Sequence, residues 1–133
     1  MRTKLTMLLL CALSISSARA WAADDFVPLF DGKTLAGWTP LPGGTWNVSD
    51  GAIVGSQDSS ETRHGMLMSD KQYGDFIVRL KYKSLAGNSG FYFRVQKVDH
   101  AVSVKGFQAE IDADGKDVGG LYETLGRAWV AQP

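Results

Sequence analysis

Two short segments of the sequence carry polar, chemically capable side chains at every second position. The polar set of the first segment is Tyr92, Arg94 and Gln96. The polar set of the second segment is Gln108, Glu110 and Asp112. The positions between them are apolar or aromatic, and alternation of this kind is typical of a half-buried β-strand whose successive side chains point to opposite faces.

If these two strands pair, neighbouring side chains lie ~4.5–5.5 Å apart across the ladder. Arg94 could then meet Glu110 or Asp112 directly. One interpretation is a concave sugar-binding face with an acid/base group, a cation and an aromatic ring. The other is a solvated outer face whose charges only form cross-strand ion pairs. The alternation itself is compatible with both, and two carboxylates would also suit ordinary glycoside hydrolysis, which needs separations of ~5–9.5 Å.

Two further groups of residues have side chains that could bind a metal or do acid/base work. The run Asp112-Ala113-Asp114-Gly115-Lys116-Asp117 resembles an oxygen-rich cation loop, but it lacks the distal glutamate of an EF-hand. Aspartate and glycine in such clusters also make ordinary turns. His64 and His100 lie in polar stretches without a ligand motif, so we expect both on surface loops.

Short strands must position these groups, because no segment shows helical periodicity over ten or more residues. Clear strand alternation covers 76–83, 91–96 and 107–112, and weaker strands are expected at 46–48, 52–54, 66–68 and 121–122. Turn residues separate them. Ser49-Asp50-Gly51 predicts a hairpin, and Gly87-Asn88-Ser89-Gly90 predicts a tight turn. Many short strands with frequent turns favour an all-β sandwich.

The first twenty residues have the pattern of a secretory signal peptide. A positively charged start is followed by a short apolar run and by Ala18-Arg19-Ala20, a small-residue cleavage site. We expect cleavage after Ala20, with Ala22 as the alternative, and a periplasmic or secreted product with no membrane anchor. Cleavage would remove Cys11, three basic residues and no acidic one. This leaves 11 basic residues against 14 acidic ones, a net charge of −3 that argues against a nucleic-acid partner.

Four blocks of the sequence together resemble one known family. They are LFDGKTLAGW at 29–38, WNVSDG at 46–51, YGDF at 73–76, and the pair GNSGFYFR at 87–94 and GFQAEID at 106–112. In this order they resemble the 3-keto-disaccharide hydrolase family (DUF1080), also described as a 3-keto-glucoside 1,2-lyase/3-keto-2-hydroxy-glucal hydratase domain. The resemblance implies a concanavalin-A-like jelly-roll sandwich. It also implies that residues 26–133 are the N-terminal part of a C-terminally truncated domain, since 128–133 show no strand pattern.

The resemblance also implies an activity, namely cleavage of a 3-keto-disaccharide or 3-keto-glucoside by elimination and hydration. In that chemistry Glu110 would be the base, Arg94 or a divalent metal would stabilise the enolate, and Asp112 would assist as acid or ligand. The expected contacts to a small carbohydrate substrate are Tyr92, Gln108 and Tyr122. A non-catalytic carbohydrate-binding module and an inactive fragment remain the alternatives.

Overall fold

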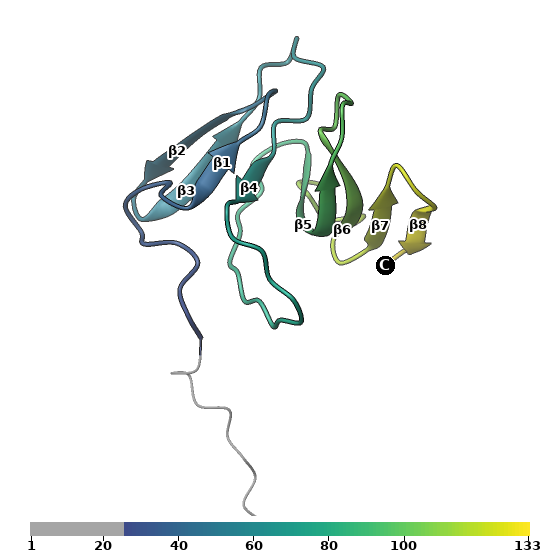
Figure 1. The fold of residues 1–133 in the computed structure, drawn as a ribbon. Coiled ribbons are helices and arrows are strands. Elements are labelled where there is room, and N and C mark those ends of the chain that lie inside the picture. Colours follow the sequence, from purple (N-terminus) through teal and green to yellow (C-terminus); the bar gives the residue numbers. More distant parts are fainter. Residues whose placement is uncertain (1–25) are drawn as a thin grey trace, which may run out of the picture.

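The computed structural model describes residues 26–133, which form eight β-strands and no helix (Figure 1). The strands are β1 (Trp38–Pro40), β2 (Thr45–Ser49), β3 (Ala52–Ser56), β4 (Leu67–Ser69), β5 (Asn88–Lys97), β6 (Val104–Asp112), β7 (Leu121–Thr124) and β8 (Ala128–Ala131). The predicted signal peptide, residues 1–20, lies outside the described residues. Within 26–133, no helix is long and apolar enough to cross a membrane.

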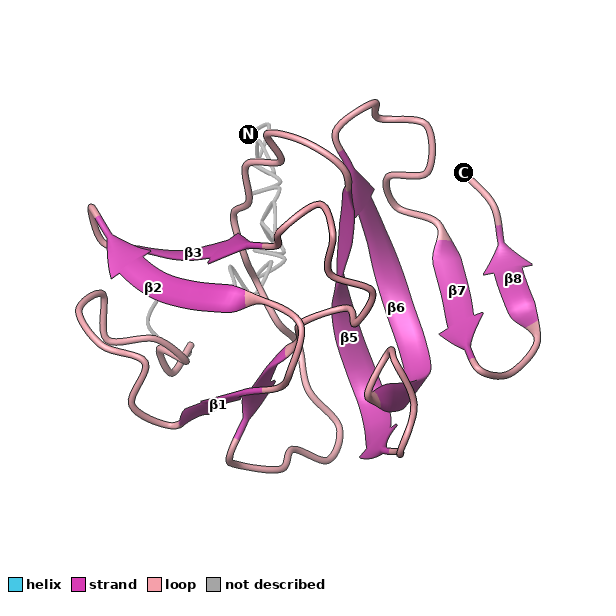
Figure 2. Ribbon diagram, turned by 90° about the horizontal axis from the view of Figure 1, so that it is seen from above, coloured by secondary structure: helices cyan, strands magenta, loops and turns pink. Residues whose placement is uncertain are grey.

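All strand pairing is antiparallel. β1 pairs with β4, β2 pairs with β3, and β5, β6, β7 and β8 form one four-stranded sheet in that order. Figure 2 shows the four strands of this sheet side by side, with the two small sheets on the flank of β5. The prediction of an all-β, jelly-roll-like protein is confirmed. The four-stranded sheet is the element that positions the candidate site.

The first family-like block owes its form to one carboxylate. Oδ1 of Asp31 accepts hydrogen bonds of 2.7 Å from the backbone N–H groups of Lys33 and Thr34, and Oδ2 accepts one of 2.7 Å from the Thr34 hydroxyl. At the end of the block, the indole Nε1 of Trp38 donates to the carbonyl oxygen of Leu29 at 3.0 Å. The block is therefore a loop closed by its own side chains, which ends where β1 begins.

The predicted hairpin at residues 49–51 is confirmed. Ser49 of β2 pairs with Ala52 of β3, so the loop consists of Asp50 and Gly51 alone. Both have positive φ angles, 51° and 75°. Two positive φ angles define the turn whose twist matches that of antiparallel strands, and Asp-Gly is a preferred sequence for it.

Two loop backbones cross closely before β2 and β4. Gly65 has φ +63°, and a Cβ atom there would lie 2.5 Å from the carbonyl carbon of Gly43. At Gly43, φ +114°, a Cβ would lie 2.5 Å from the carbonyl carbon of Arg63. A hydrogen bond of 3.2 Å from the Gly65 N–H to the carbonyl of Pro42 joins the two loops at this crossing. Glycine is required here by space and by backbone conformation together.

Three expectations about elements are wrong. Residues 76–83 form no strand, and most of their apolar side chains are exposed, Ile77 by 62%. The alternation is present in the sequence, but a strand also needs a backbone partner, and this segment has none among the described residues. The predicted turn at 87–90 is mostly strand, because β5 already begins at Asn88. The final residues, which showed no strand pattern, include β8.

The apolar core of the described residues is small. Its buried side chains are Leu41, Val102 and Val104, the last two exposed by only 3% and 2%. They lie where the loop before β2 meets the β5–β6 hairpin. A backbone hydrogen bond of 3.0 Å from the His64 N–H to the carbonyl oxygen of Ala101 ties the loop before β4 to the same hairpin. The large sheet is thus anchored to the N-terminal strands at one end of its longest hairpin.

Candidate functional site

The register of the large sheet gathers the predicted site residues on one face. Asn88 pairs with Asp112, Gly90 with Glu110, and Tyr92 with Gln108. Gln108 also pairs with Tyr122 of β7 on its other side. We call this surface the polar face; its members are Asn88, Tyr92, Gln108, Glu110, Asp112, Tyr122 and Thr124. Five of the six predicted site residues therefore share it.

The polar face holds the most buried polar side chains of the described residues. Gln108 is 5% exposed and Glu110 is 6% exposed, and Thr124 is similarly buried. The opposite face carries Phe93 and Phe107, which stack at 5.7 Å between ring centroids but are only half-buried. The interpretation of a solvated outer face is therefore wrong. Burying a carboxylate is costly unless it is hydrogen-bonded, so Glu110 needs a specific environment.

Two side-chain amides supply that environment. Oε2 of Glu110 accepts a hydrogen bond of 2.9 Å from Nε2 of Gln108 and one of 3.1 Å from Nδ2 of Asn88. Burial is the main cause that raises the pKa of Glu110 above its ordinary value. The hydrogen bond from Asn88 lowers this pKa, whereas the nearby negative charges of Asp117 and Asp112 raise it further. A carboxyl group with a raised pKa is suited to general acid/base work near neutral pH.

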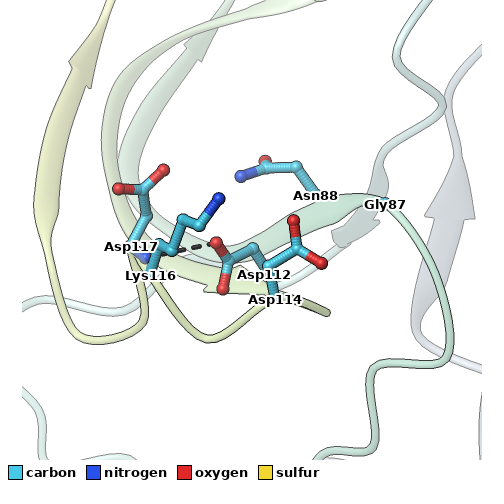
Figure 3. A pocket seen from close by; sticks show the side chains of 6 residues that line it. All are labelled: Gly87, Asn88, Asp112, Asp114, Lys116 and Asp117. Atoms are coloured by element: carbon cyan, nitrogen blue, oxygen red, sulfur yellow. Dashed lines mark hydrogen bonds between the residues drawn. The ribbon is translucent and has the colours of Figure 1, made fainter.

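An open pocket of about 430 Å³ lies beside this carboxylate. Its lining is Gly87, Asn88, Asp112, Asp114, Lys116 and Asp117 (Figure 3). The figure shows the Lys116 ammonium and the Asn88 amide directed into the same space, with the Asp112 carboxylate below them. Because Asn88 lines the pocket and also contacts Glu110, it joins the pocket to the buried carboxylate.

The loop after β6 shapes this pocket. Oδ2 of Asp112 accepts a hydrogen bond of 3.2 Å from the backbone N–H of Asp117, and Oδ1 of Asp112 is buried without a partner. In residues 26–133, no group of three or more histidine, aspartate or glutamate side chains is arranged to hold a metal ion. The pocket combines one ammonium group, three carboxylates and one amide, a set that can hydrogen-bond the hydroxyl groups of a sugar.

The expected contact between Arg94 and the carboxylates of β6 is not found. The β5–β6 register shifts between Phe93 and Gln96, where β5 has one residue more than β6. Arg94 lies in this bulge with φ 51°, and its Nη2 forms an ion pair of 2.9 Å with Oδ1 of Asp75. A bulge resets the alternation of side chains, so Gln96 lies opposite Lys105 and off the polar face. The prediction that Tyr92, Arg94 and Gln96 share one face is wrong for this reason.

Two tyrosines complete the polar face. The hydroxyl of Thr124 donates to Oη of Tyr92 at 3.4 Å, which spans β6 from β7 to β5. Burial raises the pKa of Tyr92 above its ordinary value. Tyr122 packs edge-to-face on Trp129 of β8, with ring centroids 5.4 Å apart. Contacts with neighbouring strands therefore fix the orientation of both tyrosine rings on the polar face.

The histidines lie apart from this site. His64 and His100 are both exposed, as expected. His100 lines a second cavity of about 310 Å³ at the far end of the β5–β6 hairpin, together with Arg63 and Lys97. Nδ1 of His100 accepts a hydrogen bond of 3.2 Å from the backbone N–H of Val102, which ties the ring to its own loop.

Sequence reasoning missed two residues of the site. The sequence predicts a turn at Asn88, although its place three residues before the aromatic alternation is also compatible with a longer strand. Lys116 lies within the acidic run 112–117, whose pattern points to a cation loop or a turn and not to a sugar site. The signal that could have found both is the pairing of 88–92 with 108–112, which follows if the first segment is extended to Asn88.

Comparison with known proteins gives two matches. The family model of the 3-keto-alpha-glucoside-1,2-lyase-like domain matches residues 25–133. A curated 3-keto-disaccharide hydrolase of Bacteroides thetaiotaomicron is 29% identical over 106 residues, which cover 72% of this chain and 33% of the relative. The chain thus spans about one third of the length of that relative. No solved structure matches significantly. Because the family model covers most of the sequence, the chain belongs to the 3-keto-alpha-glucoside-1,2-lyase-like domain family.

Proposed function

We propose that this chain acts on a 3-keto-disaccharide or 3-keto-glucoside and cleaves its glycosidic bond by 1,2-elimination followed by hydration. The observation that carries the proposal is Glu110, a buried carboxyl group with a raised pKa at the side of an open polar pocket. Family membership and the similarity to a 3-keto-disaccharide hydrolase support the substrate class.

The ketone at C3 of such a substrate acidifies the proton on C2. In the proposed reaction Glu110 takes this proton, and the electron pair of the C–H bond forms an enolate with the C3 oxygen. Collapse of the enolate forms the C1–C2 double bond and breaks the bond from C1 to the leaving oxygen, which takes a proton from an acid. Water then adds its hydroxyl to C1 and a proton to C2, so the net reaction is hydrolysis.

The lining of the pocket offers a group for each remaining role. Lys116 supplies a positive charge for the developing enolate oxygen, the role first expected of Arg94. We leave Arg94 out of the proposed site because its guanidinium is paired with Asp75. Asp112 is the proposed acid for the leaving group, and Tyr92 and Tyr122 are the proposed sugar contacts on the polar face.

Deuterium incorporation tests the reaction. The protein is incubated with 3-keto-trehalose or 3-keto-lactose in D₂O, and the initial rates of monosaccharide release and of label at C2 are measured. Elimination and hydration place deuterium at C2 of the released keto sugar, faster than the exchange seen without protein. Release without label at C2 would indicate direct hydrolysis instead.

Variants of two glutamates assign the base. Glu110→Gln keeps the shape of the side chain and is expected to lose turnover by at least a hundredfold. Glu123→Gln is the matched control, because Glu123 lies on the opposite face of the sheet, paired with Arg127. Full activity of folded Glu110→Gln protein would refute the assignment.

A carbohydrate-binding module without catalysis is the second candidate. It is favoured by the fact that the side chains lining the pocket include Asn88 and Asp112 but not Glu110 itself. Calorimetric binding of a keto sugar without release of product would support this candidate over the enzyme. Aggregation of the purified chain without binding would support the remaining alternative, an inactive fragment.

We also propose that the protein is exported after removal of residues 1–20. The basic start, the apolar run and the small-residue site support this. Cell fractionation followed by N-terminal sequencing tests it, since export with cleavage leaves a chain that begins at Trp21. An intact Met1 start on protein in the cytoplasm would contradict it.

A further inference from the structure

The side-chain amide nitrogen of Gln108 donates its hydrogen bonds to groups within the protein. Its Nε2 lies 2.9 Å from Oε2 of Glu110 and 3.0 Å from the carbonyl oxygen of Ser89. A primary amide nitrogen carries two hydrogens, and these two contacts use both of them. No N–H of Gln108 remains to donate to a sugar, which was the role first expected of this residue.

Gly90 makes this arrangement possible. It pairs with Glu110 in the ladder, and a Cβ atom at Gly90 would lie 2.5 Å from both Cγ and Nε2 of Gln108. The same Cβ would lie 2.8 Å from the carbonyl oxygen of Ala109. The φ angle of Gly90 is outside the left-handed region, so the backbone does not require glycine here. What requires glycine is the space occupied by the Gln108 side chain and by the carbonyl oxygen of Ala109.

We infer that Gln108 is a positioning residue that acts through Glu110: its amide bridges Ser89 to the Glu110 carboxylate across the space left by Gly90. The role of Glu110 as a base rests on the proposed function, whereas the two hydrogen bonds of the Gln108 amide are observed independently of it. A side chain clamped at both amide hydrogens holds one carboxylate oxygen in place and leaves the other free to accept a proton.

Other ionisable groups also act on Glu110 and must stay unchanged in the test. They are Asp112 on the same strand, Asp117 in the loop after β6, and Tyr92 on β5. Tyr122 on β7 interacts with Tyr92 in turn. None of these groups is altered in the variants below, so a change in the titration of Glu110 reports on the bridge.

The test is an NMR titration of the full chain labelled with ¹³C at glutamate side chains. The sequence has three glutamates, Glu61, Glu110 and Glu123, and Glu110→Gln assigns the signal. In Gln108→Met, which keeps the length of the side chain but has no donor, the titration midpoint of Glu110 is expected to move upward. Gln57→Met is the matched control, since Gln57 donates only to the backbone of Arg63, and it should leave the midpoint unchanged.

Gly90→Ala supplies an independent route to the same result. It keeps Gln108 but pushes its side chain away, so the midpoint of Glu110 should again move upward. In a Gln108→Ala background, Gly90→Ala should cause no further shift. A full shift in that background would show that the contact with the Ala109 carbonyl is responsible and would overturn the inference. An unchanged midpoint in folded Gln108→Met would overturn it as well.

Kinetics with the keto sugar separate positioning from sugar contact. Gln108→Met is expected to lower kcat on the order of tenfold with KM little changed, because the base is misplaced while binding is kept. A raised KM with unchanged kcat would instead make Gln108 a substrate contact. If the unsubstituted protein shows no turnover at all, the proposed function fails, and the NMR titration still decides the role of Gln108.

Discussion

The side-chain amide of Asn88 donates a hydrogen bond of 3.1 Å to Oε2 of Glu110, across the first three rungs of the β5–β6 ladder. Asn88 is exposed and Glu110 is buried, so this one contact connects an open pocket to the carboxylate beside it. A molecule bound in the pocket would therefore lie against Asn88, the side chain that also holds the Glu110 carboxylate.

Replacing Asn88 should change the pH dependence of activity. Asn88→Asp removes a donor to the ionised form of Glu110 and adds a like charge, and both effects raise the pKa of Glu110. Since a base acts only when it is deprotonated, the acid limb of the kcat/KM profile should move to higher pH. Asn47→Asp, at an exposed position of β2, is the control. An acid limb shared by all three proteins would contradict the prediction.

Glu110→Gln should make stability less dependent on pH. Burial raises the pKa of Glu110 above its ordinary value of 4.5, so the folded state binds this proton more tightly than the unfolded state does. The group therefore contributes stability at low pH and loses it as pH rises from about 4.5 through the folded pKa. Urea unfolding should show that the free energy of unfolding of Glu110→Gln rises relative to that of the unsubstituted protein as pH increases over this range. A gap that stays constant with pH would contradict the prediction.

Asp31→Asn should have the opposite pH signature. Hydrogen bonds from the Thr34 hydroxyl, then from the backbone N–H groups of Thr34 and Lys33, lower the pKa of Asp31 from 3.8 to about 2. A lowered pKa contributes stability that is present above 3.8 and is lost as pH falls toward 2. Asp31→Asn should therefore be less stable than the unsubstituted protein near neutral pH, and the difference should shrink in acid. Asp50→Asn, in the β2–β3 turn, serves as the comparison.

Gly65→Ala should destabilise the fold by about 2–4 kcal/mol. The new Cβ would overlap the backbone of Gly43 and Gly44, and the φ of +63° is unfavourable for alanine. Gly74→Ala is the matched control, since a Cβ there meets nothing within 4 Å and its φ is not positive. Thermal unfolding measures both variants. Equal melting temperatures of the two variants would show that the loop backbones shift to accommodate the new Cβ without loss of stability.

The exposed apolar segment at 76–85 should make the isolated chain prone to association. Ile77 is 62% exposed and Leu85 is 81% exposed, and adjacent apolar side chains of this kind mark interaction or aggregation surfaces. The double variant Ile77→Lys, Leu85→Lys should reduce binding of the dye ANS and raise solubility. Val27→Lys, an equally exposed single site, controls for added charge. Unchanged dye binding in the double variant would place the apolar surface elsewhere.

Alternation and turn chemistry predict most of the two long strands that carry the site. The β2–β3 hairpin, the 107–112 strand and the sharing of one face by Gln108, Glu110 and Asp112 all follow from local pattern. The wrong predictions concern features that depend on contacts between distant parts of the sequence. Residues 76–83 alternate as well as β5 does, but alternation does not supply a partner for backbone hydrogen bonds.

The position of Arg94 could not be predicted for a different reason. A bulge leaves no mark in a period-two pattern, because the extra residue keeps the alternation of the letters while changing the face to which they point. The sequence pattern also left open whether the polar face is solvated, and the structure shows that Gln108 and Glu110 are buried. Their burial depends on the Gly90 space and on neighbouring strands, which single-sequence periodicity does not contain.

The bulge at Arg94 has a consequence for the site at the other end of β5. Its partner Gly106 has φ +142°, and a side chain there would lie 2.7 Å from the carbonyl oxygen of Arg94. The extra residue of β5 therefore lies opposite a glycine, where the absence of a side chain leaves room for the Arg94 carbonyl. Counting from that fixed point, Gly90 falls opposite Glu110 and Asn88 opposite Asp112. The position of the bulge thus fixes the register of β5 against β6, and with it the residues that lie beside the Glu110 carboxylate.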